Sequence, residues 1–161
     1  MKHSTNLNYC QKIFSFFKQN MLLLFFGLIM LASDQLTKYF IKRSALTTTG
    51  HLIDITYTTN TGTLFSLFSG TYLINIVFIV LSIFAIMFLT YLLRLKESHL
   101  TNFSYILLIS GILGNFIDRL LYGSVIDWIN IHFWPIFNLA DLFLFIGIFL
   151  SILFLIKNNS G

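Results

Sequence analysis

Charged residues are scarce in this sequence. They make up 10% of its 161 residues, against about 25% in an average soluble domain, while 57% of the residues are hydrophobic. So few charges cannot cover a water-exposed surface, which excludes a soluble globular domain, a coiled coil and a disordered chain. The composition therefore predicts an integral membrane protein, and the length suits one compact bundle of about four spanning helices.

Cysteine and proline are almost absent as well. The single cysteine, Cys10, excludes an intrachain disulfide and a cysteine metal cluster. The single proline, Pro135, predicts mostly uninterrupted helices. The net charge is +4, but the lysines and arginines are spread along the chain, so no nucleic-acid partner is expected.

The uncharged runs predict an all-α membrane fold within a single domain, 1–161. A polar, lysine-bearing head is expected over residues 1–18, followed by helices at about 20–41, 71–93, 99–121 and 138–156. The first and fourth uncharged runs have only 15 residues each, so they reach span length only if Asp34 and Asp141 lie within or at the edge of the membrane. Ionisable groups at that depth are usually functional. A cleaved signal peptide is the alternative for the first span.

The distribution of basic residues predicts the orientation. Six of them fall on the side that carries both termini and four on the other side, which favours cytoplasmic termini. Five of the six acidic residues then collect at the outer face: Asp34, Asp54, Asp118, Asp127 and Asp141.

The connection between the first two spans predicts a small β-rich cradle at the outer interface, at about residues 50–68. Residues 53–59 alternate apolar and polar side chains and are rich in β-branched types. Asn60 and Gly62 belong to a turn signal, after which residues 63–68 could form the returning strand. An irregular loop is the alternative.

The third span carries small and polar residues on one face. Gly111, Gly114, Asn115 and Asp118 fall within an arc of about 100°. Small residues allow another helix to approach closely, so plain helix packing is one interpretation of this face. For Asp118 and the adjacent Arg119, an anchoring role at the membrane interface is the alternative to a functional one.

Two acids, Asp127 and Asp141, are separated by 14 positions between the third and fourth spans. Asn138 is a predicted helix N-cap, with Asp141 three residues further on. Two carboxyls that meet in a low dielectric share a proton, so that one can activate water while the other protonates a carbonyl. This pattern favours aspartic protease chemistry. A loop acid with a simple cap, a metal site that includes His132, a small transporter or proton relay, and a non-catalytic lipopeptide-binding scaffold are the alternatives.

Five motifs in order resemble the lipoprotein signal peptidase (signal peptidase II) family over roughly residues 20–156. They are Asp34-Gln-Leu-Thr-Lys38, Asn60-Thr-Gly62, Gly114-Asn-Phe-Ile-Asp-Arg119, Gly123-Ser-Val-Ile-Asp127 and Phe137-Asn-Leu-Ala-Asp141. The resemblance implies an aspartic endopeptidase of the bacterial cytoplasmic (inner) membrane. Such an enzyme removes the signal peptide of prolipoproteins on the N-terminal side of a diacylglyceryl-modified cysteine.

The resemblance also assigns expected roles. It implies a catalytic dyad of Asp127 and Asp141, a substrate site lined by Asn60, Gly62, Asn115, Arg119 and Asn138, and structural support from Asp34, Lys38, Gly111, Gly114 and Asp118. It implies no metal or organic cofactor, a monomer, an active site near the outer face, and three kinds of partner: prolipoproteins, membrane lipids and cyclic-peptide inhibitors of the globomycin type. Thr63, Leu64, Ser110 and Trp128 depart from the family pattern and bear on substrate preference.

Overall fold

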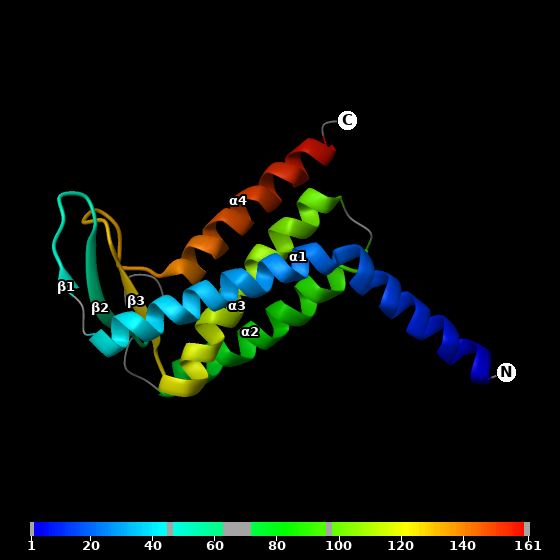
Figure 1. Cartoon of the computed structure of the whole chain (residues 1–161), viewed down its shortest axis with the longest axis horizontal. Helices are drawn as coiled ribbons and strands as arrows, with labels where there is room; N and C mark the ends of the chain where they lie inside the picture. Colours follow the sequence, from blue (N-terminus) through cyan, green and yellow to red (C-terminus); the bar gives the residue numbers. More distant parts are fainter. Residues whose placement is uncertain (1, 45–46, 63–71, 96–97, 160–161) are drawn as a thin grey trace.

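The protein folds into four long helices and a small sheet, as a computed structural model shows (Figure 1). The structure describes residues 2–44, 47–62, 72–95 and 98–159. Its helices are α1 (Lys2–Ser44), α2 (Tyr72–Leu92), α3 (His99–Tyr122) and α4 (Leu139–Asn159). Each contains a stretch long and apolar enough to cross a membrane: Asn20–Ser44, Tyr72–Leu92, His99–Tyr122 and Leu139–Lys157. The four-span membrane fold expected from the sequence is therefore confirmed.

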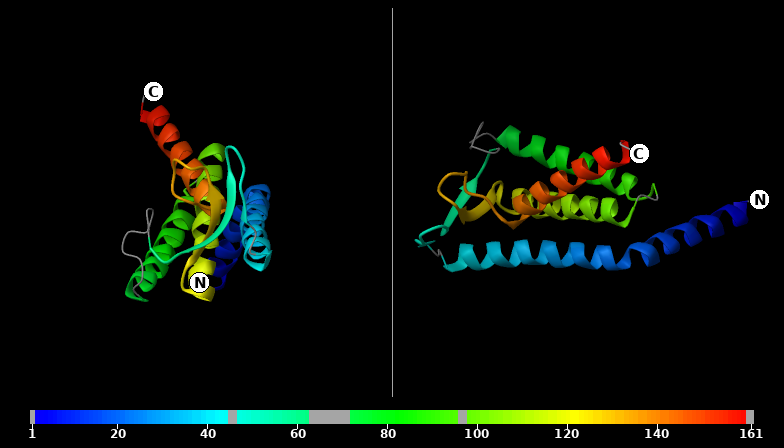
Figure 2. Two further views of the ribbon diagram at one scale, coloured as in Figure 1. Left: turned by 90° about the vertical axis from the view of Figure 1, so that its left-hand side faces the viewer. Right: turned by 90° about the horizontal axis from the view of Figure 1, so that it is seen from above.

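Helix α1 is longer than the expected first span because it begins at Lys2 rather than near residue 20. Its first turns project away from the other helices, whereas its second half runs along the bundle (Figures 1 and 2). Residues expected as a separate polar head, from Lys2 onward, thus continue the spanning helix. The sequence did not predict this helical segment, because its polar composition lacks the long apolar run that marks a membrane span.

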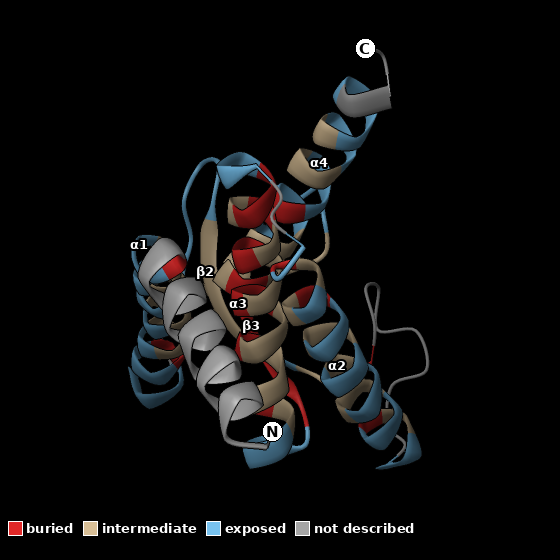
Figure 3. Cartoon of the chain, turned by 90° about the vertical axis from the view of Figure 1, so that its right-hand side faces the viewer, coloured by how far each residue is buried: buried red, intermediate tan, exposed pale blue. Residues whose placement is uncertain are grey.

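Helix α3 lies at the centre of the bundle. It packs against α1, α2 and α4, and its buried residues recur along most of its length (Figure 3). Glycine allows the closest of these approaches, since a Cβ added at Gly111 would lie 2.5 Å from the carbonyl oxygen of Ala140 in α4. Ser98 caps the beginning of α3, and Gly123, with a φ of 68°, ends it in the left-handed conformation that favours glycine.

A three-stranded antiparallel sheet covers one end of the bundle, here called the sheet end (Figures 1 and 2). Its strands are β1 (Thr47–Thr48), β2 (Asp54–Asn60) and β3 (Val125–Asn130), in the order β1-β2-β3. Strand β2 faces β3 with Thr58 opposite Asp127 and Asn60 opposite Val125. The α1–α2 connection and the α3–α4 connection therefore share one sheet.

The expected cradle is present, and it contains two strand pairings that the sequence did not predict. Residues 63–68, proposed as the returning strand, lie outside the described residues. The strands that flank β2 are β1 and β3, although the sequence predicted only an apolar interfacial segment around Asp127. A strand can pair with a segment far along the chain, and local alternation in the sequence does not specify that partner.

Candidate active site

Asp127 and Asp141 meet at one buried asparagine. Asp127 lies in the middle of β3 and Asp141 in the first turn of α4. The side-chain nitrogen of Asn138 donates a hydrogen bond to Asp127 Oδ1 at 2.7 Å, and its backbone nitrogen donates to Asp141 Oδ2 at 3.3 Å. Asn138 is fully buried. A single residue therefore connects both carboxyls, which come from different elements.

The beginning of α4 explains why Asn138 and Asp141 lie so close. Asn138 Oδ1 accepts a hydrogen bond from the backbone nitrogen of Asp141 at 2.9 Å, while Asp141 accepts one from the backbone of Asn138 in return. This reciprocal arrangement is a capping box with aspartate at the third helical position. The N-cap predicted at Asn138 is thus also a junction between the two acids.

The loop between β3 and α4 is closed at its base, which brings Asp127 to the same place. Ile129 and Phe137 exchange two backbone hydrogen bonds, of 2.8 and 3.1 Å, and the backbone nitrogen of Trp128 also donates to the carbonyl of Phe137. This short bridge draws the end of the loop against β3. The residue after Phe137 is Asn138, so its side chain lies beside Asp127.

Asp127 is held from the opposite side by β2. Asn60, at the end of that strand, donates to Asp127 Oδ2 at 3.1 Å and accepts from the backbone nitrogen of Gly62 at 2.9 Å. The pKa of Asp127 is raised from 3.8 to about 7, chiefly by burial and secondarily by the negative charge of Asp141, while the amides of Asn60 and Asn138 act to lower it. Asp127 can therefore keep a proton up to neutral pH.

Asp141 is held by α3. Asn115 Nδ2 donates to Asp141 Oδ1 at 2.8 Å. The carbonyl oxygen of the same side chain accepts from Asn138 Nδ2 at 3.1 Å and from Lys38 Nζ at 3.2 Å. Asn115 is thus oriented by donors on two sides, and its own donor is directed at Asp141.

Arg119 lies one helical turn beyond Asn115. Its Nη2 donates to the carbonyl oxygen of Gly62 at 3.0 Å, and its guanidinium carbon lies 4.5 Å from the centre of the Phe78 ring. Nη1 is buried and has no hydrogen-bond partner among the residues that the structure describes. An unsatisfied buried donor is unfavourable, so this nitrogen is available to an acceptor on a bound substrate.

Three buried charges lie behind the carboxyl pair. Lys38 Nζ contacts Asp34 Oδ2 at 2.8 Å and Asp118 Oδ2 at 2.9 Å, and all three side chains are fully buried. A Cβ added at Gly114 would lie 2.6 Å from Asp34 Oδ2 and 2.9 Å from the Cβ of Ala140. Gly114 therefore makes room both for Asp34 and for the beginning of α4.

The structure thus gathers every site residue expected from the sequence around the sheet end.

Two polar residues at the site were not singled out from the sequence. Gln35 Nε2 lies within hydrogen-bond distance of three acceptors: the carbonyl oxygen of Gly114 at 3.1 Å, Asp34 Oδ2 at 3.2 Å and Asp118 Oδ1 at 3.3 Å. Asn75, which is buried in α2, donates to the carbonyl oxygen of Arg119 at 3.3 Å. The spacing of Gln35 three residues before Lys38 places both on one helical face, and Asn75 interrupts an apolar run. These two features of the sequence could have identified Gln35 and Asn75, respectively, as candidates.

The residues that depart from the family pattern lie in different places. Ser110 is buried between α3 and α1, where its hydroxyl donates to the carbonyl oxygens of Gly27 and Ile106. Trp128 Nε1 is buried and finds no hydrogen-bond partner within the described part of the chain. Thr63 and Leu64 lie outside the described residues.

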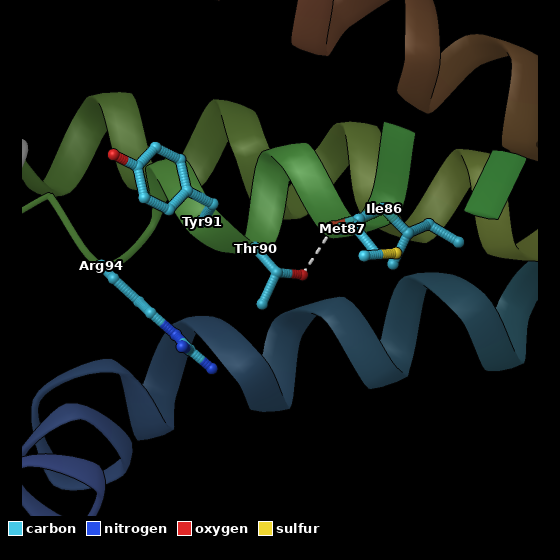
Figure 4. A pocket seen from close by; sticks show the side chains of 5 residues that line it. All are labelled: Ile86, Met87, Thr90, Tyr91 and Arg94. Atoms are coloured by element: carbon cyan, nitrogen blue, oxygen red, sulfur yellow. Dashed lines mark hydrogen bonds between the residues drawn. The ribbon is translucent and has the colours of Figure 1, made fainter. Parts of the chain in front are cut away.

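A metal site and a separate cavity were also considered. Among the described residues no cluster of three or more possible metal ligands occurs, and His132 Nε2 lies 3.7 Å from Asp54 Oδ1. A cavity of about 260 Å³ opens along the last turns of α2 and extends to Arg94, at the opposite end of the helix from Asn75 (Figure 4). It is lined by Ile86, Met87, Thr90, Tyr91 and Arg94. None of the site residues lines it.

Fold and site together define a multi-pass membrane protein with two carboxyls, both hydrogen-bonded to one buried asparagine, at one end of its helical bundle. The model of the signal peptidase (SPase) II family matches residues 26–157. The lipoprotein signal peptidase of Caldicellulosiruptor bescii is 39% identical over 132 residues, which are 80% of this chain and 85% of that protein. The chain therefore belongs to the signal peptidase II family and is a peptidase of the membrane.

Further relatives agree with this assignment. The lipoprotein signal peptidase of Thermodesulfovibrio yellowstonii is 38% identical over 138 residues, covering 81% of this chain and 89% of that protein. A solved structure of a bacterial membrane enzyme superposes with a TM-score of 0.79 at 31% identity, over 86% of this chain and 90% of that chain. A second solved bacterial membrane enzyme gives a TM-score of 0.75, also at 31% identity.

Proposed function

We propose that this protein is an aspartic endopeptidase that removes the signal peptide from lipidated bacterial prolipoproteins. The cut falls on the N-terminal side of the diacylglyceryl-modified cysteine. The observation that carries this proposal is the attachment of Asp127 and Asp141 to the same buried residue, Asn138. The signal peptidase II family and the names of its lipoprotein-processing relatives support the substrate class.

The two acids divide the chemistry between them. One carboxyl of the pair holds a proton, which the raised pKa of Asp127 favours, and the other carboxylate accepts a proton from a water molecule. The water oxygen attacks the scissile carbonyl carbon, the protonated carboxyl gives its proton to the carbonyl oxygen, and a tetrahedral gem-diol forms. The C–N bond then breaks as a proton passes to the leaving nitrogen, which releases a new carboxyl and a new amine. Asn60, Asn115 and Asn138 hold the two carboxyls in place throughout.

The substrate approaches within the bilayer. A signal peptide and a diacylglyceryl group both partition into the membrane, so the scissile bond lies near the membrane surface, at the level of the sheet end. Arg119 Nη1 and the backbone around Gly62 offer polar contacts to the extended peptide there. Cyclic-peptide inhibitors of the globomycin type would occupy the same place, and the surrounding lipids cover the exposed apolar faces of the helices.

We further propose that the chain is a monomer of the bacterial cytoplasmic membrane with both termini in the cytoplasm. The excess of lysine and arginine on the side of the termini supports this orientation. It places the sheet end, with Asp127 and Asp141, at the outer face. Labelling of cysteines introduced near either end with a membrane-impermeant reagent would check it.

The decisive experiment compares single variants of the reconstituted full chain on a lipidated prolipoprotein. Asp127→Asn and Asp141→Asn should each abolish cleavage, a loss of at least about 10⁴-fold. Asp54→Asn is the matched control because Asp54 lies in the same sheet but contacts Gly50 and Asn130 instead. That variant should cleave within about twofold of the parent.

Two further arms separate the alternatives. Cleavage that survives both Asn variants contradicts the dyad, and loss of activity on adding a chelator would indicate a metal site. A parent protein that binds the lipidated precursor without cutting it would indicate a non-catalytic scaffold. Equal cleavage of a precursor without the lipid would overturn the lipid-dependent substrate class.

A further inference from the structure

The buried charges behind the carboxyl pair contact the backbone at two equivalent places. Asp34 Oδ1 accepts a hydrogen bond from the backbone nitrogen of Ala140 at 2.9 Å. Asp118 Oδ2 accepts one from the backbone nitrogen of Ile126 at 3.1 Å. Ala140 directly precedes Asp141, and Ile126 directly precedes Asp127. Each buried carboxylate therefore holds the backbone of the residue directly before one member of the proposed dyad.

Lys38 connects these two carboxylates. Its ammonium lies 2.8 Å from Asp34 and 2.9 Å from Asp118, and Gln35, one turn earlier on α1, donates to the same two side chains. Buried charges of this kind are unfavourable unless they are paired and hydrogen-bonded. The mutual contacts of the group therefore restrict the distance between Asp34 and Asp118, and with it the distance between the two backbone segments.

Lys38 also determines which way the Asn115 amide faces. An ammonium group has three donors and no acceptor, and Lys38 uses them on Asp34, Asp118 and Asn115 Oδ1. The oxygen of Asn115 must therefore point to Lys38, which leaves its nitrogen to donate to Asp141 Oδ1. If the lysine were replaced by a group with an acceptor, the amide could turn over and present its oxygen to Asp141.

We propose that Asp34, Lys38 and Asp118 form a positioning clamp that sets the spacing of Asp127 and Asp141 and the orientation of Asn115. This inference rests on the proposed protease function and deepens it. The three residues touch no reacting atom. They act through Ala140, Ile126 and Asn115, so their effect is on the geometry of the pair rather than on substrate binding.

The main test is a charge-balanced double variant, Lys38→Gln with Asp118→Asn. It removes one positive and one negative charge, so the buried net charge is unchanged, and it supplies acceptors that let Asn115 turn over. For the full chain in phospholipid vesicles we expect kcat to fall about 100-fold while KM stays within about threefold. We also expect the pH profile of kcat to shift, because Asp127 and Asp141 no longer share their native surroundings.

The matched control joins the same two helices at the opposite end of the bundle. Asn102 Nδ2 in α3 donates to Asn20 Oδ1 in α1 at 3.5 Å, and both side chains are buried. The double variant Asn20→Leu with Asn102→Leu removes a polar contact of α1 with α3 without touching the clamp. Its kcat and pH profile should stay within about twofold of the parent even if its unfolding temperature changes.

A milder variant keeps the proposal testable if the charge-balanced variant does not fold. Gln35→Met removes a donor from Asp34, from Asp118 and from the carbonyl oxygen of Gly114 but leaves Lys38 in place, and kcat should fall about tenfold with KM unchanged. The clamp is overturned if either folded variant keeps the parent kcat and pH profile, or if KM rises in place of the fall in kcat. The proposed function fails separately, when Asp127→Asn or Asp141→Asn still cleaves.

Discussion

The two halves of α3 bury polar groups in different ways. In the half near its beginning, the buried polar groups are uncharged: Ser104 donates to the carbonyl of Thr101, and Ser110 donates to the carbonyl of Ile106, each at 2.8 Å. Ser110 and Asn102 also contact Gly27 and Asn20 of α1, and Ser104 accepts from Ser151 of α4. In the half at the sheet end, Asn115 and Asp118 bond to α1, α4 and β3. The first half thus joins α3 to α1 and α4 through uncharged groups, whereas the second half also buries a charged side chain and reaches β3.

This difference shows what each half contributes. Glycines allow close packing in both: Gly147 of α4 sits against Leu108 and the carbonyl of Ser104, and Gly114 sits against Asp34 and Ala140. Away from the sheet, that packing brings apolar helices together and stabilises the bundle. At the sheet end, it brings charged and amide side chains to fixed positions. Changes in the first half should affect stability, and changes in the second should affect catalysis more than stability.

The two helix caps, Asn138 of α4 and Ser98 of α3, should show the largest difference in kcat when each is replaced by alanine. Asn138→Ala removes the cap of α4 and the donor to Asp127, and it should lower kcat by about 100- to 1,000-fold, as loss of one donor to a reacting group does. Ser98→Ala removes only the cap of α3 and should leave kcat within about twofold. Both should reduce the free energy of unfolding by about 1 kcal/mol. Cleavage rates and thermal unfolding of the two variants check this. Equal rates would show that Asn138 is only a cap.

The two glycines give the next contrast. A Cβ at Gly114 would meet Asp34 Oδ2 at 2.6 Å, and one at Gly147 would meet Leu108 Cγ at 2.8 Å. Both alanine variants should lose about 1–3 kcal/mol of stability through overpacking. Gly114→Ala should also lower kcat about 100-fold because it displaces the carboxylate behind Ala140. Gly147→Ala should leave kcat within about threefold when corrected for folded protein. A similar kcat for both would mean that the sheet end tolerates displacement.

The overall fold was largely predictable because hydrophobicity acts locally along the chain. Long uncharged runs can only be helices that span the membrane, so four helices follow from the positions of the charges. Asn138 as a helix cap follows equally from its residue type and from Asp141 three positions later. The beginning of α1 at Lys2 could not be predicted in this way, because a polar segment lacks the apolar signal that marks a span.

The site was predictable as a set of residues but not as a network. Resemblance pointed to Asp34, Lys38 and Asp118, and helical spacing places Lys38 beside Asp34. Nothing in the sequence indicates that Lys38 also contacts Asp118 or that Asp34 holds Ala140. Pairing of β2 with β3 was missed for the same reason. These contacts join segments more than 60 positions apart, and residue periodicity informs only on neighbours along one element.

A pH titration of stability would sharpen the comparison further. Because the pKa of Asp127 is about 7 in the folded protein and 3.8 is its ordinary value, the folded state binds a proton that the unfolded state releases between these values. The contribution of Asp127 to the free energy of unfolding is therefore largest below about pH 4. It falls by about 1.4 kcal/mol for each pH unit up to about pH 7. Asp127→Asn should lack this decline and exceed the parent in stability above pH 7. Gly147→Ala should follow the parent curve in parallel. A stability difference between the parent and Asp127→Asn that does not change over this range would contradict a raised pKa.

The smallest effect is expected for a lysine one turn beyond the clamp. Lys42 lies four residues after Lys38 on α1, but it is exposed, with Nζ 3.4 Å from the centre of the Tyr122 ring. Lys42→Met keeps the length of the side chain and removes a cation–π contact worth about 0.5–1 kcal/mol at an exposed site. Thermal unfolding should detect at most that loss, and kcat should stay within about twofold. A larger fall in kcat would show that positive charge near the sheet end matters in general. If kcat is unchanged in Lys42→Met but falls in Lys38→Gln with Asp118→Asn, the loss of activity is due to the buried position of Lys38 between Asp34 and Asp118.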